Sequence, residues 1–161
     1  HNMKAVNNAG VITFYQSLPN SFRSSTGLHL NVKGWSDSEM KDNGLFDVII
    51  DDNYDERIHD LGEIYWDTGA SVFRKDKSNK SFDKSVSELK EQAISNFKSR
   101  IGGELAKTDW YIIREMDNGA DVPEDIVDAR VALRELSDTV ESEINALTTK
   151  AKVITYDFPN I

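Results

Sequence analysis

The chain lacks several residue types and patterns that whole classes of protein require. Its 161 residues include no cysteine, three prolines and three histidines. The absence of cysteine excludes a disulfide framework, a zinc site with cysteine ligands and thiol catalysis. No apolar run approaches the ~18 residues that a membrane-spanning helix needs. We therefore expect no membrane among the partners.

Positive charge is also scarce. Lysine and arginine number 19 against 28 aspartates and glutamates, which leaves a net charge of −9. Proteins that bind the phosphate backbone of nucleic acids depend on lysine and arginine. The charge balance therefore argues against nucleic acid as a partner.

What is present is enough for a folded protein. Hydrophobic residues make up 39% and aromatic residues 9% of the chain, so a core can bury roughly two-thirds of the unfolded surface. At this length we expect one domain, or two small ones sharing a core. Residues 1–2 precede Met3 and are expected to be a cloning remnant, so His1 is given no chemistry. No segment has the charged-then-apolar pattern of a secretory signal.

The fold class expected is α+β: a small, mostly antiparallel β-rich module at residues 3–80, then a helical module at residues 81–161 with an extended C-terminal tail. Residues 6–12 predict a turn between two short strands, with asparagine and glycine at the positive-φ positions. Residues 28–32 alternate apolar and polar, which predicts a half-buried strand with His29 facing solvent.

The rest of the first module follows similar patterns. A capping box at Ser36 and Glu39 predicts a helix over 37–43 that ends before Gly44. Residues 45–50 form an apolar strand pattern, and residues 63–75 predict a hairpin. Residues 76–81 are polar throughout and indicate a connector.

After the connector the apolar period becomes helical. A capping box at Ser85 and Glu88 and an apolar stripe predict a helix over 83–106. Thr108 and Gly119 are placed to cap a helix over 109–118. Residues 110–113 would also suit a strand, but the agreement of both caps favours the helix.

A third helix is expected to begin at Pro123, because proline favours the first positions of helices. Apolar residues recur every seven positions from Ile126 to Leu147, and a break is expected near Ser137. Residues 153–159 indicate a strand or an extended tail.

Chemical motifs are incomplete. Asp51, Asn53 and Asp55 match the first ligands of a calcium loop, but Glu56 replaces the turn glycine and Gly62 the bidentate glutamate. An ordinary acidic loop is therefore favoured, and no metal site is assigned.

His59 is followed by an acidic residue, yet no nucleophile-elbow serine accompanies it. No glycine-rich phosphate loop or dinucleotide motif is present either. We assign no catalytic residue, no cofactor and no enzymatic activity; a hydrolase built on His59 is the weakest hypothesis.

A longer pattern resembles a known family. Leu105-Ala106-Lys107-Thr108-Asp109-Trp110 is followed at fixed spacings by Arg114, Asp117, Gly119, Val122-Pro123, Arg130 and Leu133-Arg134. This pattern is similar to the C-terminal signature of bacteriophage tail-fibre assembly and tail-associated proteins. A looser likeness to the N-terminal module of phage virion proteins extends over Trp35–Met40, Gly44, Tyr54-Asp55 and Leu61–Glu63.

The resemblance implies a non-enzymatic bacteriophage tail component without a cofactor. It would act through protein–protein contacts, either as a tail-fibre assembly chaperone or as a small adaptor. Its partner would be the tail fibre or another tail protein, and a homo-oligomer is left open. The location implied is the host cytoplasm during assembly, with retention in the virion tail for an adaptor.

The residues of this signature have two physical interpretations. The structural one expects Trp110 to anchor the junction between helices, with the three arginines paired to Asp109 or Asp117. The other is direct contact with a partner. Eleven acids lie between Asp109 and Glu143 against three arginines, a net charge of −8. This acidic stretch either keeps a helix face soluble or helps to dock a partner.

A module that binds glycan or metal is the alternative. It would use aromatic side chains of the β-rich half as platforms, because aromatic rings stack on sugars. The surface aromatics expected for that role are Trp35, Tyr54, Tyr65 and Trp66. Packing in the core would explain the same residues.

Overall fold

The computed structural model describes residues 3–161, which fall into two compact units, one ending at Lys80 and the other beginning at Ser81. Helices account for 42% and strands for 22% of the chain, with the sheet in the first half and helices in the second, which confirms the α+β class. The expected cloning remnant lies outside the described residues. Among residues 3–161, no helix is both long enough and apolar enough to cross a bilayer.

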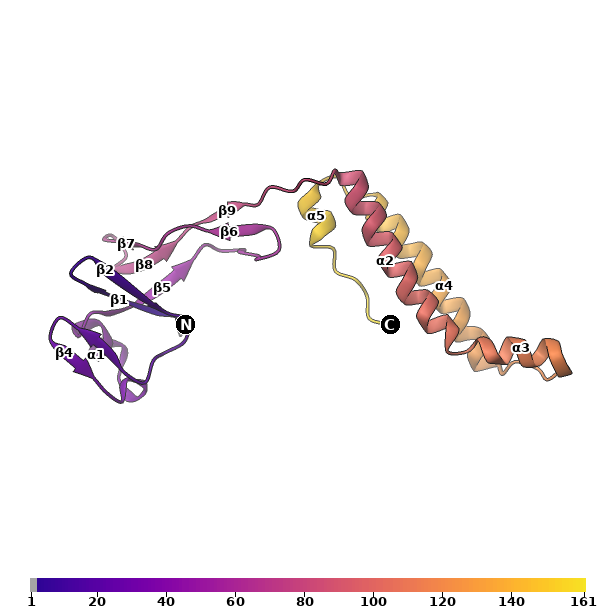
Figure 1. The fold of residues 1–161 in the computed structure, drawn as a ribbon, viewed down its shortest axis with the longest axis horizontal. Coiled ribbons are helices and arrows are strands. Elements are labelled where there is room, and N and C mark those ends of the chain that lie inside the picture. The colour runs from indigo at the N-terminus through magenta and orange to yellow at the C-terminus, as the bar shows by residue number, and fades with distance from the viewer. Residues whose placement is uncertain (1–2) are drawn as a thin grey trace. The chain divides into compact units, whose positions relative to one another are not determined.

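The first unit is built on a five-stranded sheet with the strand order β2-β1-β5-β8-β7 (Figure 1). Every neighbouring pair is antiparallel except β5 and β8. The predicted hairpin joins the sheet through its second strand, which makes that pair parallel. The strands are β1 (Lys4–Asn8), β2 (Val11–Tyr15), β5 (Leu45–Ile50), β7 (Tyr65–Asp67) and β8 (Val72–Lys75).

The turn between β1 and β2 has two residues in the left-handed region, Ala9 at φ 52° and Gly10 at φ 89°. Such turns match the right-handed twist of the flanking strands. The expected turn is therefore present, but Ala9 rather than an asparagine takes its first position. The Asn7 side chain contributes differently: its Oδ1 accepts a hydrogen bond from the Gly10 N–H at 2.8 Å.

The strand predicted at residues 28–32 is wrong in register. Strands β3 (Phe22–Ser24) and β4 (Gly27–His29) form a hairpin in which Phe22 faces His29. Cross-strand partners share a face, so His29 lies against buried Phe22, with ring centroids 4.9 Å apart. Leu28 and Leu30 are exposed instead. The tight Ser24–Gly27 turn, rather than the apolar pattern, sets this register.

Beyond this hairpin, the backbone adopts a left-handed residue at Asn31 and then a 3₁₀ turn, η1 (Val32–Gly34), which carries Val32 into the core. Helix α1 (Asp37–Asp42) follows, and its predicted capping box is present: the Glu39 N–H donates to Ser36 Oγ, and the Ser36 N–H donates to the Glu39 carboxylate.

The sheet has a small apolar core on each face. Successive residues of a strand point to opposite faces, so Ala5 and Val6 of β1 belong to different clusters. One cluster is Val6, Phe22, Val32, Met40 and Leu45; the other is Ala5, Val48 and Phe73.

The polar connector contains regular structure that the sequence does not indicate. Residues Lys77–Asn79 form β9, which pairs antiparallel with β6 (His59–Leu61). The pairing depends on backbone hydrogen bonds and on the Asp51 carboxylate, which accepts the Lys77 N–H at 2.9 Å. No apolar side chain of β9 takes part, so hydrophobic periodicity could not reveal it.

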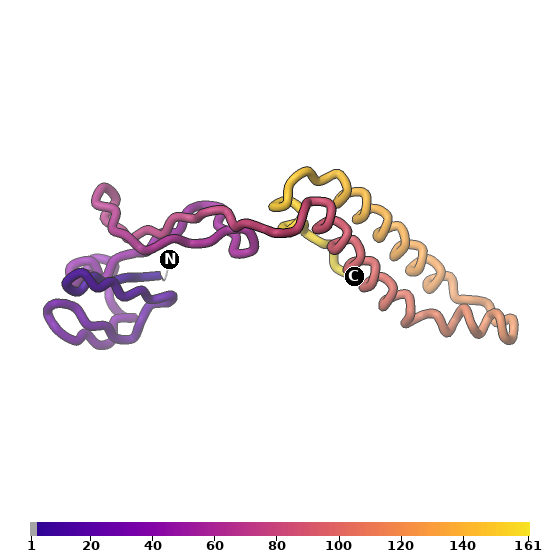
Figure 2. Tube along the Cα trace, turned by 45° about the horizontal axis from the view of Figure 1, so that its top comes forward, coloured from indigo at the N-terminus to yellow at the C-terminus, as the bar shows by residue number. Residues whose placement is uncertain are grey.

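The second unit is centred on two long helices, α2 (Val86–Ala106) and α4 (Glu124–Asn145), which lie side by side (Figures 1 and 2). Their shared core is Phe97, Ile101, Val140 and Ile144. The predicted capping box at Ser85 is present. The break expected near Ser137 is wrong, because α4 runs unbroken to Asn145. Leu136 and Val140 pack on the core on either side of that point and hold the helix together.

Two shorter helices complete this unit, α3 (Asp109–Asn118) and α5 (Lys150–Ile154). The extended tail predicted from residue 153 is wrong for its first residues. Thr149 caps α5 by accepting the Lys152 N–H at 3.2 Å, so Val153 and Ile154 are helical. From residue 156 the chain has no regular structure.

Candidate functional site

The helix junction at residues 105–130 contains most of the residues singled out in the sequence, and Arg130 is at its centre. Only 8% of Arg130 is exposed. Its guanidinium donates to the Leu105 carbonyl oxygen at 2.8 Å and to Thr108 Oγ1 at 2.7 Å, and pairs with Asp109 at 3.0 Å. The Leu105 carbonyl belongs to the last turn of α2 and also accepts the Thr108 N–H at 3.1 Å and the Thr108 hydroxyl at 3.2 Å. Arg130 therefore ties α4 to the end of α2 and the start of α3.

Only one of the two predicted caps of α3 makes a capping hydrogen bond. Thr108 is the N-cap residue of α3, as predicted, but its hydroxyl makes no capping bond: it accepts from Arg130 and donates to the Leu105 carbonyl instead. Gly119 ends α3 at φ 74°, and its N–H donates to the Glu115 carbonyl at 2.8 Å. This C-cap and the start of α4 directly after Pro123 are confirmed.

Trp110 does not anchor the junction, so that structural prediction is wrong. Its side chain is 51% exposed. The indole stacks on the neighbouring Tyr111 ring at 3.7 Å between centroids, and the Arg114 guanidinium lies 5.1 Å from the indole centroid. Trp110 is not part of the α2–α4 core, and Arg130 joins the helices in its place.

The other charged residues of the signature are not assembled into one network. The expected arginine pairing is present for Arg130 and Asp109. Arg114 lies over the two aromatic rings instead, and its Nε is buried without a hydrogen bond. Asp117 and Arg134 are exposed, and neither forms an ion pair with another residue of the 3–161 range.

A group of exposed apolar side chains lies on α3 and α4 next to this junction, and most of these residues were not singled out in the sequence. It consists of large side chains of α3 and the first half of α4, with exposures from 43% for Val127 to 83% for Met116. We call it the α3–α4 apolar surface and define it as Trp110, Ile113, Met116, Val127 and Val131. Five of the eleven exposed large hydrophobic residues in the described chain lie in this short stretch.

Helix α3 is poorly supported by the rest of the unit. It contributes no buried residue, although it is ten residues long and half apolar. Isolated helices of this length are marginal in water, and most helical stability in proteins comes from packing. A second polypeptide lying on α3 would supply the packing that the chain itself does not.

The charge around this surface is strongly one-sided. Between Asp109 and Glu135 there are eight acidic and three basic side chains. At helical spacings of three or four residues, Asp117 neighbours Ile113, Glu124 neighbours Val127, and Glu135 neighbours Val131. Of the three arginines, Arg130 is buried in the junction and Arg114 lies over aromatic rings. The apolar surface is therefore bordered mainly by carboxylates.

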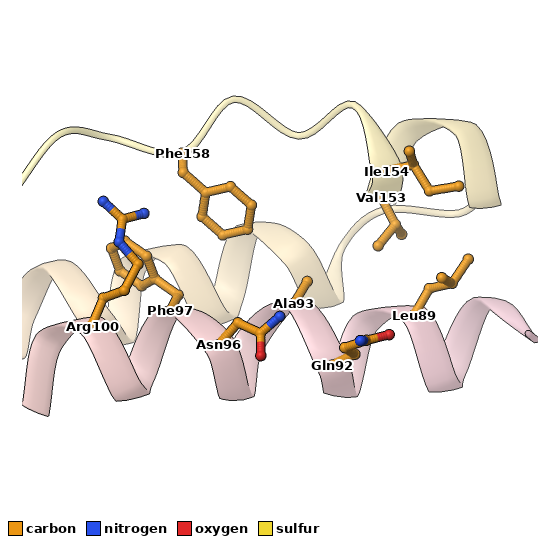
Figure 3. A pocket seen from close by; sticks show the side chains of 9 residues that line it. All are labelled: Leu89, Gln92, Ala93, Asn96, Phe97, Arg100, Val153, Ile154 and Phe158. Carbon is orange, nitrogen blue, oxygen red and sulfur yellow. The ribbon is translucent and has the colours of Figure 1, made fainter. Parts of the chain in front are cut away.

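A groove on the same unit separates α2 from the C-terminal segment (Figure 3). Its volume is about 250 Å³, and Leu89, Ala93 and Phe97 line it from α2 while Val153, Ile154 and Phe158 face them. Phe158 stacks on Phe97 with centroids 5.5 Å apart, and Arg100 lies at one end. This groove is the seam along which the C-terminal segment packs on α2.

Two of the four aromatic residues expected on the surface of the first unit are exposed, Tyr65 at 42% and Trp66 at 37%. The other two are half-buried: Trp35 packs edge-on against Phe22 and His29, at 5.8 and 5.5 Å, and Tyr54 lies beside His59. Trp66 packs edge-on against Phe46 and Phe73, and it lines a cavity of about 220 Å³.

Two carboxylates of the acidic loop before β6, those of Asp51 and Asp55, accept hydrogen bonds from other groups of the first unit. Asp55 forms a forked pair with Arg57, at 3.0 Å to Nε and 2.7 Å to Nη2. This hydrogen bonding lowers the pKa of Asp55 to about 2. Asp51 accepts the Lys77 backbone N–H. Among residues 3–161, no three His, Asp or Glu side chains are grouped so that they could hold a metal ion.

His59 is buried rather than placed in an open loop. Its Nδ1 accepts the Asp55 N–H at 2.9 Å, which fixes the ring against the acidic loop. This bond occupies Nδ1, and no serine in a nucleophile-elbow pattern accompanies the ring. The geometry gives the hydrolase hypothesis no support.

Comparison with known proteins found no relative. No protein-family model matches the chain, no curated protein is significantly similar to it, and no solved structure matches its fold.

Proposed function

We propose that this chain is a non-enzymatic bacteriophage tail component that holds another polypeptide, as a tail-fibre assembly chaperone or as a small adaptor. The observation that carries the binding role is the α3–α4 apolar surface. The phage context is supported by the Thr108–Arg134 signature in the sequence. The partner proposed is the tail fibre or another tail protein. This chain would meet its partner in the host cytoplasm during assembly, and an adaptor would then stay in the virion tail.

The surface offers part of the free energy that such a role needs. Burying a large apolar side chain completely yields ~1.5–3 kcal/mol. The five side chains are about half exposed or more, so each has about 1 kcal/mol to gain on binding, about 5 kcal/mol together. Association costs about 4–15 kcal/mol of lost freedom. The apolar contact therefore has to be supplemented by polar or charged contacts with the partner.

Co-expression with a candidate tail-fibre protein tests the proposal. We expect the fibre to be more soluble with this chain present and to co-purify with it. Replacing Ile113 and Met116 by serine should abolish both effects without unfolding the helices, because both side chains face water. Leu28→Ser with Leu30→Ser is the matched control, since these exposed leucines lie on the other unit.

Two results would contradict the proposal. One is a fibre that folds and trimerises equally well without this chain and never co-purifies with it. The other is co-purification that the Ile113 and Met116 replacements leave unchanged. Labelling of mature virions separates the two versions, since only an adaptor remains on the particle.

A glycan-binding module is the second candidate, and the position of Trp66 favours it. The indole forms part of a cavity whose lining also includes the polar Asn7. Calorimetry against a glycan panel, with calcium added in a separate titration, tests this function. Absence of heat in both titrations excludes it, and a Trp66→Ala variant identifies the platform if a glycan binds.

A further inference from the structure

We infer that the occupant of the α3–α4 apolar surface is a basic amphipathic segment, with apolar side chains flanked by lysine or arginine. This inference rests on the proposed polypeptide-binding function and names the chemistry of its partner.

The spacing of the exposed side chains suits a helical partner. Trp110, Ile113 and Met116 follow one another at three-residue steps, and Val127 and Val131 are one helical turn apart. Side chains three and four residues apart form ridges on a helix surface, into which the ridges of a second helix pack. An amphipathic helix presents the same spacing from its own apolar face.

Charge decides which amphipathic segment fits. Carboxylates border the apolar side chains of both helices, and five more acids than bases lie in the stretch from Asp109 to Glu135. Apolar contact removes water from the rim and strengthens the interactions between charges there. A partner flanked by lysine or arginine gains from this field, whereas an acidic partner is repelled.

The same argument disfavours a second copy of the chain as the occupant. An isologous dimer would bring two identical surfaces together. Each carries eight acids against three arginines between Asp109 and Glu135, so the contact would join two surfaces of net negative charge. Like charges facing one another at a contact oppose its formation.

Binding of three designed helical peptides to the full chain tests the inference. All three share one apolar face and differ only in their flanking residues, which are lysine, glutamine or glutamate. We expect the lysine peptide to bind at least about tenfold more tightly than the glutamate peptide, with the gap shrinking at high salt. The Ile113→Ser, Met116→Ser variant should lose this binding, and the Leu28→Ser, Leu30→Ser control should keep it.

A charge reversal gives an independent measurement. The double variant Asp117→Lys, Glu124→Lys should reduce the preference for the lysine peptide, while Glu56→Lys on the other unit should leave it unchanged. Both altered acids are exposed. Because Glu124 lies in the first turn of α4, where a negative charge is favourable, circular dichroism checks that the variant keeps its helices.

The possible failures are distinguishable. Equal affinity for the lysine and glutamate peptides overturns the inference about charge and leaves the proposed function standing. No affinity for any of the peptides, together with co-purification of the fibre, overturns the inference alone. No affinity for peptides or fibre contradicts both. A dimer in sedimentation experiments that Met116→Ser dissociates shows that the occupant is a second copy, which also overturns the inference.

Discussion

At the scale of single residues, Arg130 rather than Trp110 determines the helix junction. A planar guanidinium has five donors in a fixed arrangement, so it can serve the Leu105 carbonyl, Thr108 Oγ1 and Asp109 at once. In the ring contacts of the described residues, the Trp110 indole meets Tyr111 and Arg114, which belong to the same helix. The residue most noticeable in the sequence is therefore not the residue that joins the helices.

Replacing Arg130 by alanine should lower the free energy of unfolding by about 2–3 kcal/mol, because it removes the charged donor that joins α4 to Leu105, Thr108 and Asp109. Trp110→Ala is the matched comparison and should cost about 1 kcal/mol, the value of an exposed stacking contact. Urea unfolding followed by far-UV circular dichroism measures both. A larger loss for Trp110→Ala than for Arg130→Ala would contradict this account of the junction.

Tyr156 makes the second unit sensitive to alkaline pH. Burial and the hydrogen bond to Glu143 raise the pKa of Tyr156 from 10.0 to about 12. The unfolded chain ionises this phenol near pH 10 while the folded chain still holds the proton. The stabilisation is therefore complete below pH 10 and is lost as the pH rises through 12.

Comparing the wild type with Tyr156→Phe reveals this contribution. The free energy of unfolding of the wild type should fall more steeply between pH 10 and 12 than that of the variant, which has no phenol to ionise at this position. Parallel pH profiles for the two proteins would show that the hydrogen bond to Glu143 does not contribute.

At the scale of elements, α3 is the weakest helix of the second unit, because it buries no residue. Its C-terminal cap depends on Gly119, whose φ of 74° is costly for residues with a side chain. Gly119→Ala should therefore accelerate amide exchange in α3, by about fivefold for each kcal/mol lost. The middle of α2 and α4 should be unaffected.

Gly102→Ala is the matched control for this experiment. Gly102 lies inside α2, and an added Cβ meets no atom there, so alanine should slow exchange in α2. Hydrogen exchange followed by mass spectrometry resolves both segments. Protection of α3 equal to that of α2 in the wild type would mean that α3 is better supported than its exposure indicates.

Elements with a local chemical signal could be predicted from the sequence. The capping boxes at Ser36 and Ser85, the glycine after α3 and the apolar run of β5 are all found where expected. Elements held by long-range backbone pairing could not be predicted from the sequence. β9 is polar throughout. The face on which His29 lies is set by the Ser24–Gly27 turn, whereas the apolar residues Leu28 and Leu30 on either side of it predict the opposite face.

The candidate site could be predicted only in part, for a related reason. Apolar residues occur on nearly every face of α3, from Trp110 to Ile113 and Met116. A short helix of this composition cannot bury all of them against one neighbour, and periodicity alone does not say which remain exposed. The pattern did indicate that arginine and aspartate would meet at the junction, as Arg130 and Asp109 do.

At the scale of the whole molecule, the two units differ in where their exposed apolar side chains lie. The first unit packs apolar clusters on both faces of its sheet, and its exposed large hydrophobic residues are spread from Val11 through Leu28, Leu30 and Tyr65 to Trp66. The second closes its α2–α4 core, and five of its exposed hydrophobic residues fall between residues 110 and 131, on α3 and the first half of α4. This concentration supports the proposed binding role of the helical unit.

Site-specific photo-crosslinking tests the central claim most directly. A crosslinking amino acid is placed at Met116 or at Leu30, two exposed positions on different units, and the chain is co-expressed with a candidate tail-fibre protein. The account predicts a covalent adduct with the fibre from position 116 and none from position 30. Capture of the fibre from position 30 alone, or from neither position while the proteins still co-purify, would contradict it.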